Sequence, residues 1–164
     1  MSARPKLRVL MVCMGNICRS PTAEGVLRHK LQAAGLADSV EVDSAGTHGY
    51  HVGAPPDERS QHHARRRGYD LSALRARRVS AADFERFDLV LAMDEDNLEH
   101  LEEICPPHLR SRLQLLMRHA NRAPSKVVPD PYYGGVEGFE QVLDYVEAAC
   151  DGLVGRLRSE IAQR

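Results

Sequence analysis

What the chain lacks excludes several classes of protein. The formal net charge is −1 at pH 7, so nothing indicates nucleic acid or an anionic membrane as an obligatory partner. No apolar stretch is long enough to cross a membrane, and the first one breaks at Gly15 and Asn16, too early for a signal peptide. No repeat, low-complexity tract or linker is visible, so we expect residues 1–164 to form one domain.

Cysteines are few, and they lack the spacing of a disulfide framework or a zinc site. The four are Cys13, Cys18, Cys105 and Cys150. We expect free thiols and therefore a reducing, cytoplasmic location. The adjacent His62 and His63 would point to different faces of a helix, and the arginines at 65–67 would repel a cation. The sequence therefore predicts no metal and no other cofactor.

Short apolar runs alternate with helical patterns along the chain. Strands are expected at 7–12, 40–44, 87–92 and 113–117, and helices at 21–34, 55–67, 81–86, 95–104 and 137–161. This alternation predicts an α/β protein whose parallel sheet is covered by helices on both faces. In such sheets ligands bind beyond the carboxyl ends of the strands.

One stretch organises the rest of the chain. An apolar strand ends at Cys13, a loop containing Gly15 and Asn16 follows, and Arg19 closes it six positions after the cysteine. Pro21 is typical of a first helical turn. A strand, loop and helix N-terminus in this order aim backbone N–H groups at one point, which suits an anion.

The chemistry of this loop is that of a covalent phosphate site. The helix end and Arg19 favour the thiolate of Cys13, and a guanidinium matches two phosphate oxygens. The leaving group then needs an acid, for which Asp130, held between Pro129 and Pro131, is the best candidate. We therefore predict catalytic roles for Cys13, Arg19 and Asp130.

These motifs resemble those of low-molecular-weight protein tyrosine phosphatases, and the likeness runs nearly the whole chain. The matching segments are residues 12–21, 43–47, 52–53, 56–57, 93–94 and 130–134. The resemblance implies a four-stranded parallel, Rossmann-like sheet of the phosphotyrosine phosphatase I type. It also implies a metal-independent, two-step thiol mechanism. The expected partners are a tyrosine-phosphorylated protein and inorganic phosphate, as product and inhibitor, and the expected state is a monomer or weak dimer.

The resemblance also assigns further site residues. The substrate-binding set would be Met14, Gly15, Asn16, Ile17, Cys18, Ser20, Tyr50 and Tyr132. Within this set Ser20 would donate to the Cys13 sulfur, and Asn16 with Ser44 would hold the loop in shape. Tyr50 and Tyr132 would form opposing walls for a phosphotyrosine ring.

Three positions qualify this assignment. Ile17 stands where relatives acting on phosphoarginine carry threonine, which argues against that substrate. Leu74 aligns with a histidine that joins the Asn16–Ser44 network in several relatives, so the support of the loop differs here. Cys18 could form a reversible disulfide that protects Cys13 from irreversible oxidation.

Two other functions remain as alternatives. A thiol-dependent arsenate reductase on the same scaffold would need two further cysteines as a relay, and Cys105 and Cys150 are 45 residues apart. Asp130 would also have no clear purpose in that reaction. A phosphopeptide-binding module would need neither a thiolate nor an acid. The sequence therefore favours the phosphatase.

Overall fold

The computed structural model describes residues 6–132 and 134–163. Its centre is a parallel sheet made of β1 (Leu7–Cys13), β2 (Val40–Gly46), β3 (Leu89–Ala92) and β4 (Leu113–Leu115). The strands lie in the order β2-β1-β3-β4. The predicted four-stranded parallel sheet is confirmed.

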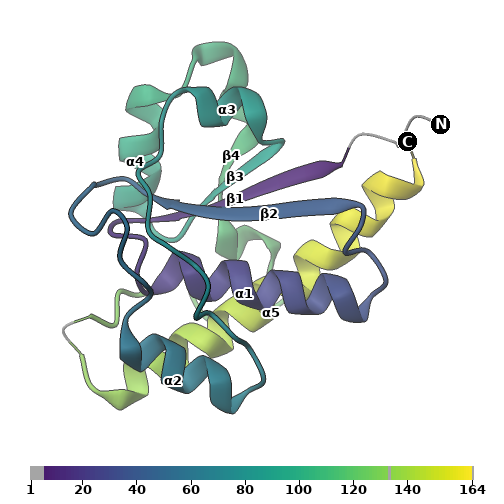
Figure 1. The fold of residues 1–164 in the computed structure, drawn as a ribbon. Helices are drawn as coiled ribbons and strands as arrows, with labels where there is room; N and C mark the ends of the chain where they lie inside the picture. Colours follow the sequence, from purple (N-terminus) through teal and green to yellow (C-terminus); the bar gives the residue numbers. More distant parts are fainter. Residues whose placement is uncertain (1–5, 133, 164) are drawn as a thin grey trace.

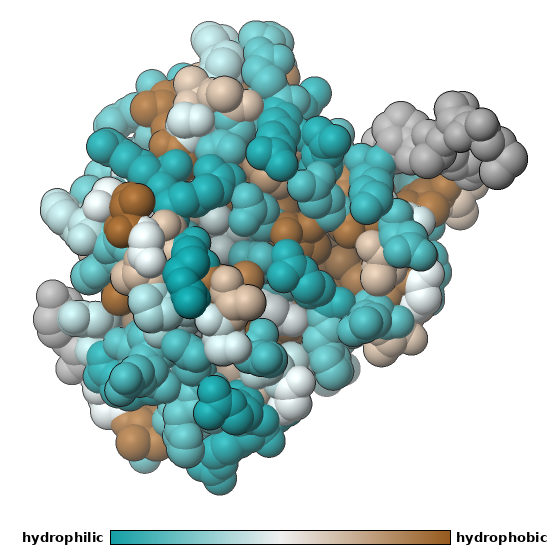
Figure 2. Space-filling model, in the orientation of Figure 1, coloured by the Kyte–Doolittle hydropathy of each residue, from teal (hydrophilic) through white to brown (hydrophobic). Residues whose placement is uncertain are grey.

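Helices cover both faces of the sheet (Figure 1). The long helices α1 (Arg19–Ala33) and α5 (Val136–Ala162) pack on one face, with α2 (Glu58–Arg66) beside them. The shorter helices α3 (Ala82–Arg86) and α4 (Glu95–Ile104) lie on the other face. The surface in Figure 2 is mainly hydrophilic, with apolar side chains visible only in patches.

Alternation along β1 divides the core into two clusters, because successive side chains of a strand point to opposite faces. Val9 and Met11 pack with α1 and α5, whereas Leu10 and Val12 pack with residues of α3 and α4. All four side chains are fully buried. β1 is therefore buried on both faces, as its continuous apolar sequence predicts.

The strand order places the end of β1 at the point where the chain changes direction across the sheet. The chain passes from β1 to β2 on one side and later to β3 on the other. Such switch points leave a crevice at the carboxyl ends of the strands. Cys13, the last residue of β1, opens onto that crevice.

The structure corrects several predicted boundaries. The first helix begins at Arg19 rather than Pro21, because the closing residues of the loop are already helical. The fourth strand is only Leu113–Leu115, since Leu116 and Met117 enter a 3₁₀ helix and are buried in the cluster that contains α5. The fourth strand is preceded by a 3₁₀ helix at Pro107–Arg112 that was not predicted from the sequence.

Candidate active site

The loop from Cys13 to Arg19 is held from outside through its carbonyl groups. Backbone N–H groups of Thr47, His48 and Asp57 donate to the carbonyls of Cys13, Met14 and Ile17 at 2.9, 3.0 and 2.8 Å. Within the described part of the chain, the N–H groups of residues 14–18 have no protein acceptor. They remain available to an anion at the centre of the loop.

Two residues let the loop turn so tightly. Asn16 has a φ of 57°, in the left-handed region that asparagine tolerates better than most residues. A Cβ on Gly46 would lie 2.7 Å from the carbonyl oxygen of Met14, so only glycine lets β2 approach the loop this closely.

A buried polar network supports the loop from below. Asn16 Nδ2 donates to Ser20 Oγ at 2.8 Å and to Ser44 Oγ at 3.0 Å, and Asn16 Oδ1 accepts from the N–H of Arg77. Ser20 Oγ lies 3.0 Å from Cys13 Sγ and 3.4 Å from a second, more distant acceptor, a backbone carbonyl. The hydroxyl of Ser20 can therefore donate to the sulfur.

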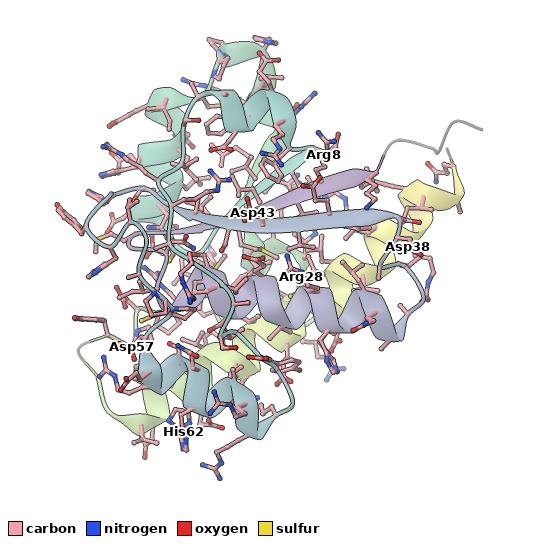
Figure 3. The ribbon with its side chains drawn as sticks, viewed as in Figure 1. Arg8, Arg28, Asp38, Asp43, Asp57 and His62 are labelled. Atoms are coloured by element: carbon pink, nitrogen blue, oxygen red, sulfur yellow. The ribbon has the colours of Figure 1, made fainter. Side chains whose placement is uncertain are left out.

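Glu24 on α1 ends this network. It is 2% exposed and accepts from Ser44 Oγ at 2.7 Å and from Arg28 Nη2 at 2.6 Å. Figure 3 shows Arg28 on α1 below β2. Burial raises the pKa of Glu24, although the hydrogen bond from Ser44 and the charge of Arg28 oppose the rise. Leu74, at the position where the resemblance predicts a difference in the support of the loop, packs against the apolar core.

Arg19 joins the loop to two other segments. Its guanidinium donates to Asp94 Oδ2 at 2.5 Å and to the carbonyl of Val128 at 3.0 Å, and lies 3.6 Å from Asp130 Oδ2. Burial opposes its charge, but the Cys13 sulfur and the hydrogen bond to Asp94 raise the pKa of Arg19. Asp94 also caps α4 by accepting from the N–H of Asn97. Arg19 is therefore fixed in orientation.

A cavity of about 360 Å³ opens over the loop. Its lining is Cys13, Met14, Gly15, Ile17, Cys18, Arg19, Tyr50, His51, Asp130 and Tyr132. The three residues predicted to be catalytic thus share one cavity. Asn16 and Ser20, predicted to bind substrate, are buried below the loop and do not line it. Tyr133, part of the Asp130 motif, lies outside the described residues.

Two residues were not predicted from the sequence: His51, which lines the cavity, and Arg59, which contacts Tyr132 in that lining. His51 lies over the loop, since its ring would be 3.0 Å from a Cβ on Gly15. Arg59 on α2 donates from Nη2 to the carbonyl of Tyr132 at 3.1 Å, and its guanidinium lies 5.5 Å from the centre of that ring. In the sequence, Arg59 is marked only by its position two residues after Asp57, the residue that caps α2.

Arg59 connects the segment of the candidate acid to the phosphate loop. Its side chain also donates to Asp57 Oδ1 and Oδ2 at 3.1 and 3.0 Å. The N–H of Asp57 in turn donates to the carbonyl of Ile17. Figure 3 shows Asp57 where the preceding loop enters α2. A series of contacts therefore links the phosphate loop, through Asp57 and Arg59, to Tyr132.

Cys18 is a buried thiol beside Cys13 in the same cavity. Burial raises the pKa of Cys18 to about 12, against a smaller opposing effect of the hydrogen bond with Ser60. Cys18 is therefore neutral at physiological pH. Cys105 and Cys150 are buried thiols in the two core clusters.

Nothing in the described residues suggests a metal centre or a membrane segment. Residues 6–132 and 134–163 contain no group of three or more His, Cys, Asp or Glu side chains arranged to hold a metal ion. No helix in those ranges has the length and hydropathy to span a bilayer.

The fold and this loop define a class of α/β proteins built around a cysteine-containing anion site, and comparison with known proteins narrows the class. Residues 8–163 match the family of low molecular weight phosphotyrosine protein phosphatases. A low molecular weight protein-tyrosine-phosphatase of Streptomyces coelicolor is 42% identical over 160 residues, covering 96% of this chain and 97% of the relative.

Solved structures agree with this match. A protein tyrosine phosphatase from Entamoeba histolytica superposes with a TM-score of 0.92 at 38% identity, covering 94% of this chain and 99% of that one. A Drosophila arginine phosphatase superposes with a TM-score of 0.84 at 34% identity, covering 92% and 97%. The chain belongs to the low molecular weight phosphotyrosine protein phosphatase family, and it is a hydrolase of phosphate monoesters.

Proposed function

We propose that Cys13 is the nucleophile of this phosphatase, Arg19 holds the phosphate and Asp130 is the general acid and base. One observation carries the proposal: the Cys13 sulfur, the unpaired N–H groups of the loop, the Arg19 guanidinium and the Asp130 carboxyl all face one cavity. The N–H groups and Arg19 offset the charge of the phosphate, which would otherwise repel a thiolate.

The first step transfers the phosphoryl group to sulfur. The thiolate of Cys13 attacks phosphorus, so that a P–S bond forms while the P–O bond to the leaving group breaks. Asp130, protonated at this stage, gives its proton to the departing phenoxide. Ser20 donates to the sulfur and stabilises it whenever it carries negative charge.

The second step releases phosphate. Asp130, now a carboxylate, removes a proton from a water molecule that attacks phosphorus, and the P–S bond breaks to restore the thiolate of Cys13. Inorganic phosphate is the product. Because it fits the same cradle, it is expected to inhibit competitively.

The shape of the cavity favours phosphotyrosine in a protein as substrate. Cys13 is only 3% exposed, whereas Tyr50 and Tyr132 stand at the mouth with 75% and 36% of their surfaces exposed. An aryl ring between the two tyrosines would reach the sulfur, and phosphoserine would be too short to do so. Ile17 in the lining argues against phosphoarginine, the substrate named for the Drosophila relative.

The remaining cysteines argue against arsenate reduction. Cys105 packs in the cluster on the α3 and α4 face, and Cys150 in the cluster on the α1 and α5 face. A disulfide relay from Cys13 through both would have to cross the sheet.

With four free thiols, we place the enzyme in the reducing cytoplasm. We expect it to be a monomer or weak dimer there.

Substrate hydrolysis by the wild type and two variants tests the proposal. Phosphotyrosine, phosphoserine and phosphoarginine peptides are compared with chelator present. We expect turnover of phosphotyrosine alone, no turnover by Cys13→Ser, and kcat lowered about 100-fold in Asp130→Asn. Activity that survives Cys13→Ser would exclude the thiol mechanism, and preferred turnover of phosphoarginine would exclude the proposed substrate.

A further inference from the structure

A second groove lies beside the mouth of the active-site cavity. It has a volume of about 290 Å³ and runs between α4 and the segment 78–81. Val79, 6% exposed, contributes to its apolar lining, and Ile104 contributes a large apolar side chain that is 42% exposed. Nothing in the proposed reaction uses this groove.

Stacked rings connect the groove to the active-site cavity. Tyr50 lines the cavity, and the ring of His48 stacks on it with centres 5.2 Å apart and planes 12° apart. The ring of His48 also contacts the ring of His100, with centres 5.0 Å apart and planes tilted by 46°, and His100 lines the groove. A polypeptide with its phosphotyrosine in the cavity therefore reaches the groove by passing over His48.

Arg78 supplies a cation at this end of the groove. Its side chain is exposed, and its Cδ would lie 3.6 Å from a Cβ on Gly49, so its stem lies against the loop that carries Tyr50. Among the described residues Arg78 has no ion-pair partner, whereas the neighbouring Arg77 pairs with Asp43 and Asp83. The guanidinium of Arg78 is thus available to an anion.

Glu103 adds a negative charge to the lining of the groove. Asp94, which binds Arg19, precedes α4, and Glu103 and Ile104 stand in the last turn of that helix. At 1.5 Å per residue, this turn is about 14 Å along the helix from Asp94. The groove therefore offers a cation, Arg78, beside the loop that carries Tyr50, and an apolar and acidic surface in the last turn of α4.

We propose that this groove binds the substrate polypeptide next to its phosphotyrosine, with an acidic side chain on Arg78 and an apolar one against Val79 and Ile104. The proposal rests on the proposed function and specifies its substrate: phosphoproteins in which acidic and then apolar residues flank the phosphotyrosine. The contact affects binding of the polypeptide and leaves the chemical step unchanged.

Kinetics on matched substrates tests this groove. Phosphotyrosine peptides with Glu, Ala, Lys or Leu at the flanking positions are compared with 4-nitrophenyl phosphate, which has no flanking chain. The enzymes are the wild type, Arg78→Ala, Ile104→Ser and the control Arg75→Ala. Arg75 is an exposed arginine on the same segment that does not line the groove.

We expect Arg78→Ala to raise KM for the Glu peptide about twofold to fivefold with kcat unchanged, as for one exposed charge contact. Ile104→Ser should raise KM for peptides with an apolar flank. Neither variant should alter KM for 4-nitrophenyl phosphate, and Arg75→Ala should behave as wild type. Equal KM for the Glu peptide in wild type and Arg78→Ala would overturn the proposal.

Binding separates this proposal from the proposed function. Peptide affinity is measured on Cys13→Ser and on the double variant Cys13→Ser with Arg78→Ala. A loss of Glu-peptide affinity in the double variant supports the groove even if the wild type proved inactive. Equal affinities in both proteins would overturn the groove while leaving the thiol mechanism intact.

Discussion

The hydroxyl of Ser44 donates a 2.7 Å hydrogen bond to Glu24. Asn16 Oδ1 accepts from the N–H of Arg77, so the amide nitrogen of Asn16 donates to both Ser44 and Ser20. Because each hydroxyl accepts from Asn16, the one proton of Ser44 goes to Glu24 and that of Ser20 is available to the sulfur of Cys13. The buried carboxylate thus anchors Ser44, which helps to hold Asn16 beneath the loop.

Removing that carboxylate should impair catalysis without touching the substrate. Glu24→Ala leaves Ser44 without its acceptor, and we expect kcat/KM to fall about tenfold and unfolding free energy by about 1–3 kcal/mol. Without an acceptor for its proton, Ser44 should hold Asn16 less firmly, and the hydrogen bond from Ser20 to the Cys13 sulfur should weaken. Glu24→Gln keeps an acceptor oxygen and should recover most activity. Unchanged kcat/KM in Glu24→Ala would contradict this role.

Arg59 should matter most for substrates with poor leaving groups. It holds Tyr132, two residues after Asp130, so its loss should misplace the proposed general acid. We expect kcat of Arg59→Ala to fall about tenfold on phosphotyrosine and little on 4-nitrophenyl phosphate, whose leaving group needs less protonation. Arg59→Lys should recover only part of the activity, since lysine lacks the planar guanidinium with its several N–H donors. Arg66→Ala, an exposed arginine on α2, is the control, and an equal fall on both substrates would count against the assignment.

Cys18 should make oxidative inactivation reversible. Peroxide converts the thiolate of Cys13 to a sulfenic acid, and the thiol of Cys18 then displaces water to form a disulfide. Because Cys18 is neutral near pH 7, this closure should be faster at higher pH. Wild type treated with peroxide should recover activity with dithiothreitol, and Cys18→Ser should recover far less. Equal recovery would refute the disulfide.

His119 should make the fold less stable in mild acid. Burial, followed by the charges of Arg156 and Arg118, lowers the pKa of His119 from 6.5 to about 4. Between these values the unfolded chain binds a proton that the folded chain does not, so stability falls as pH falls. We expect the free energy of unfolding to fall by on the order of 2 kcal/mol across this range.

Denaturant unfolding at pH 7 and at pH 4.5 measures this loss, and His119→Gln is the comparison. The variant removes the titrating ring and should lose less stability between the two values. Identical losses in both proteins would show that His119 does not carry the effect.

The sequence predicts best those parts of the site whose residues lie in one continuous stretch. Cys13, Arg19 and the helix that follows stand in one stretch, and their backbone alone builds the cradle. The place of Asp130 in the same cavity was predicted because the proposed chemistry needs an acid and the motif around Asp130 marked the segment.

Contacts between elements that are far apart in the sequence could not be predicted in this way. Glu24 looks like any helical glutamate until β2 places Ser44 against it. Arg59 meets Tyr132 only after α2 has packed beside α5. Leu116 and Met117 continue an apolar run in the sequence, and only packing against α5 turns them out of the strand.

Trapping the covalent intermediate shows most directly whether Cys13 is the nucleophile. The enzyme is quenched in acid during turnover of 4-nitrophenyl phosphate, digested and examined by mass spectrometry. We expect one added phosphoryl group on the peptide that contains Cys13 and none on the same peptide of Cys13→Ser. Steady turnover with no phosphorylated Cys13 peptide, or with the phosphoryl group on another residue, would contradict it.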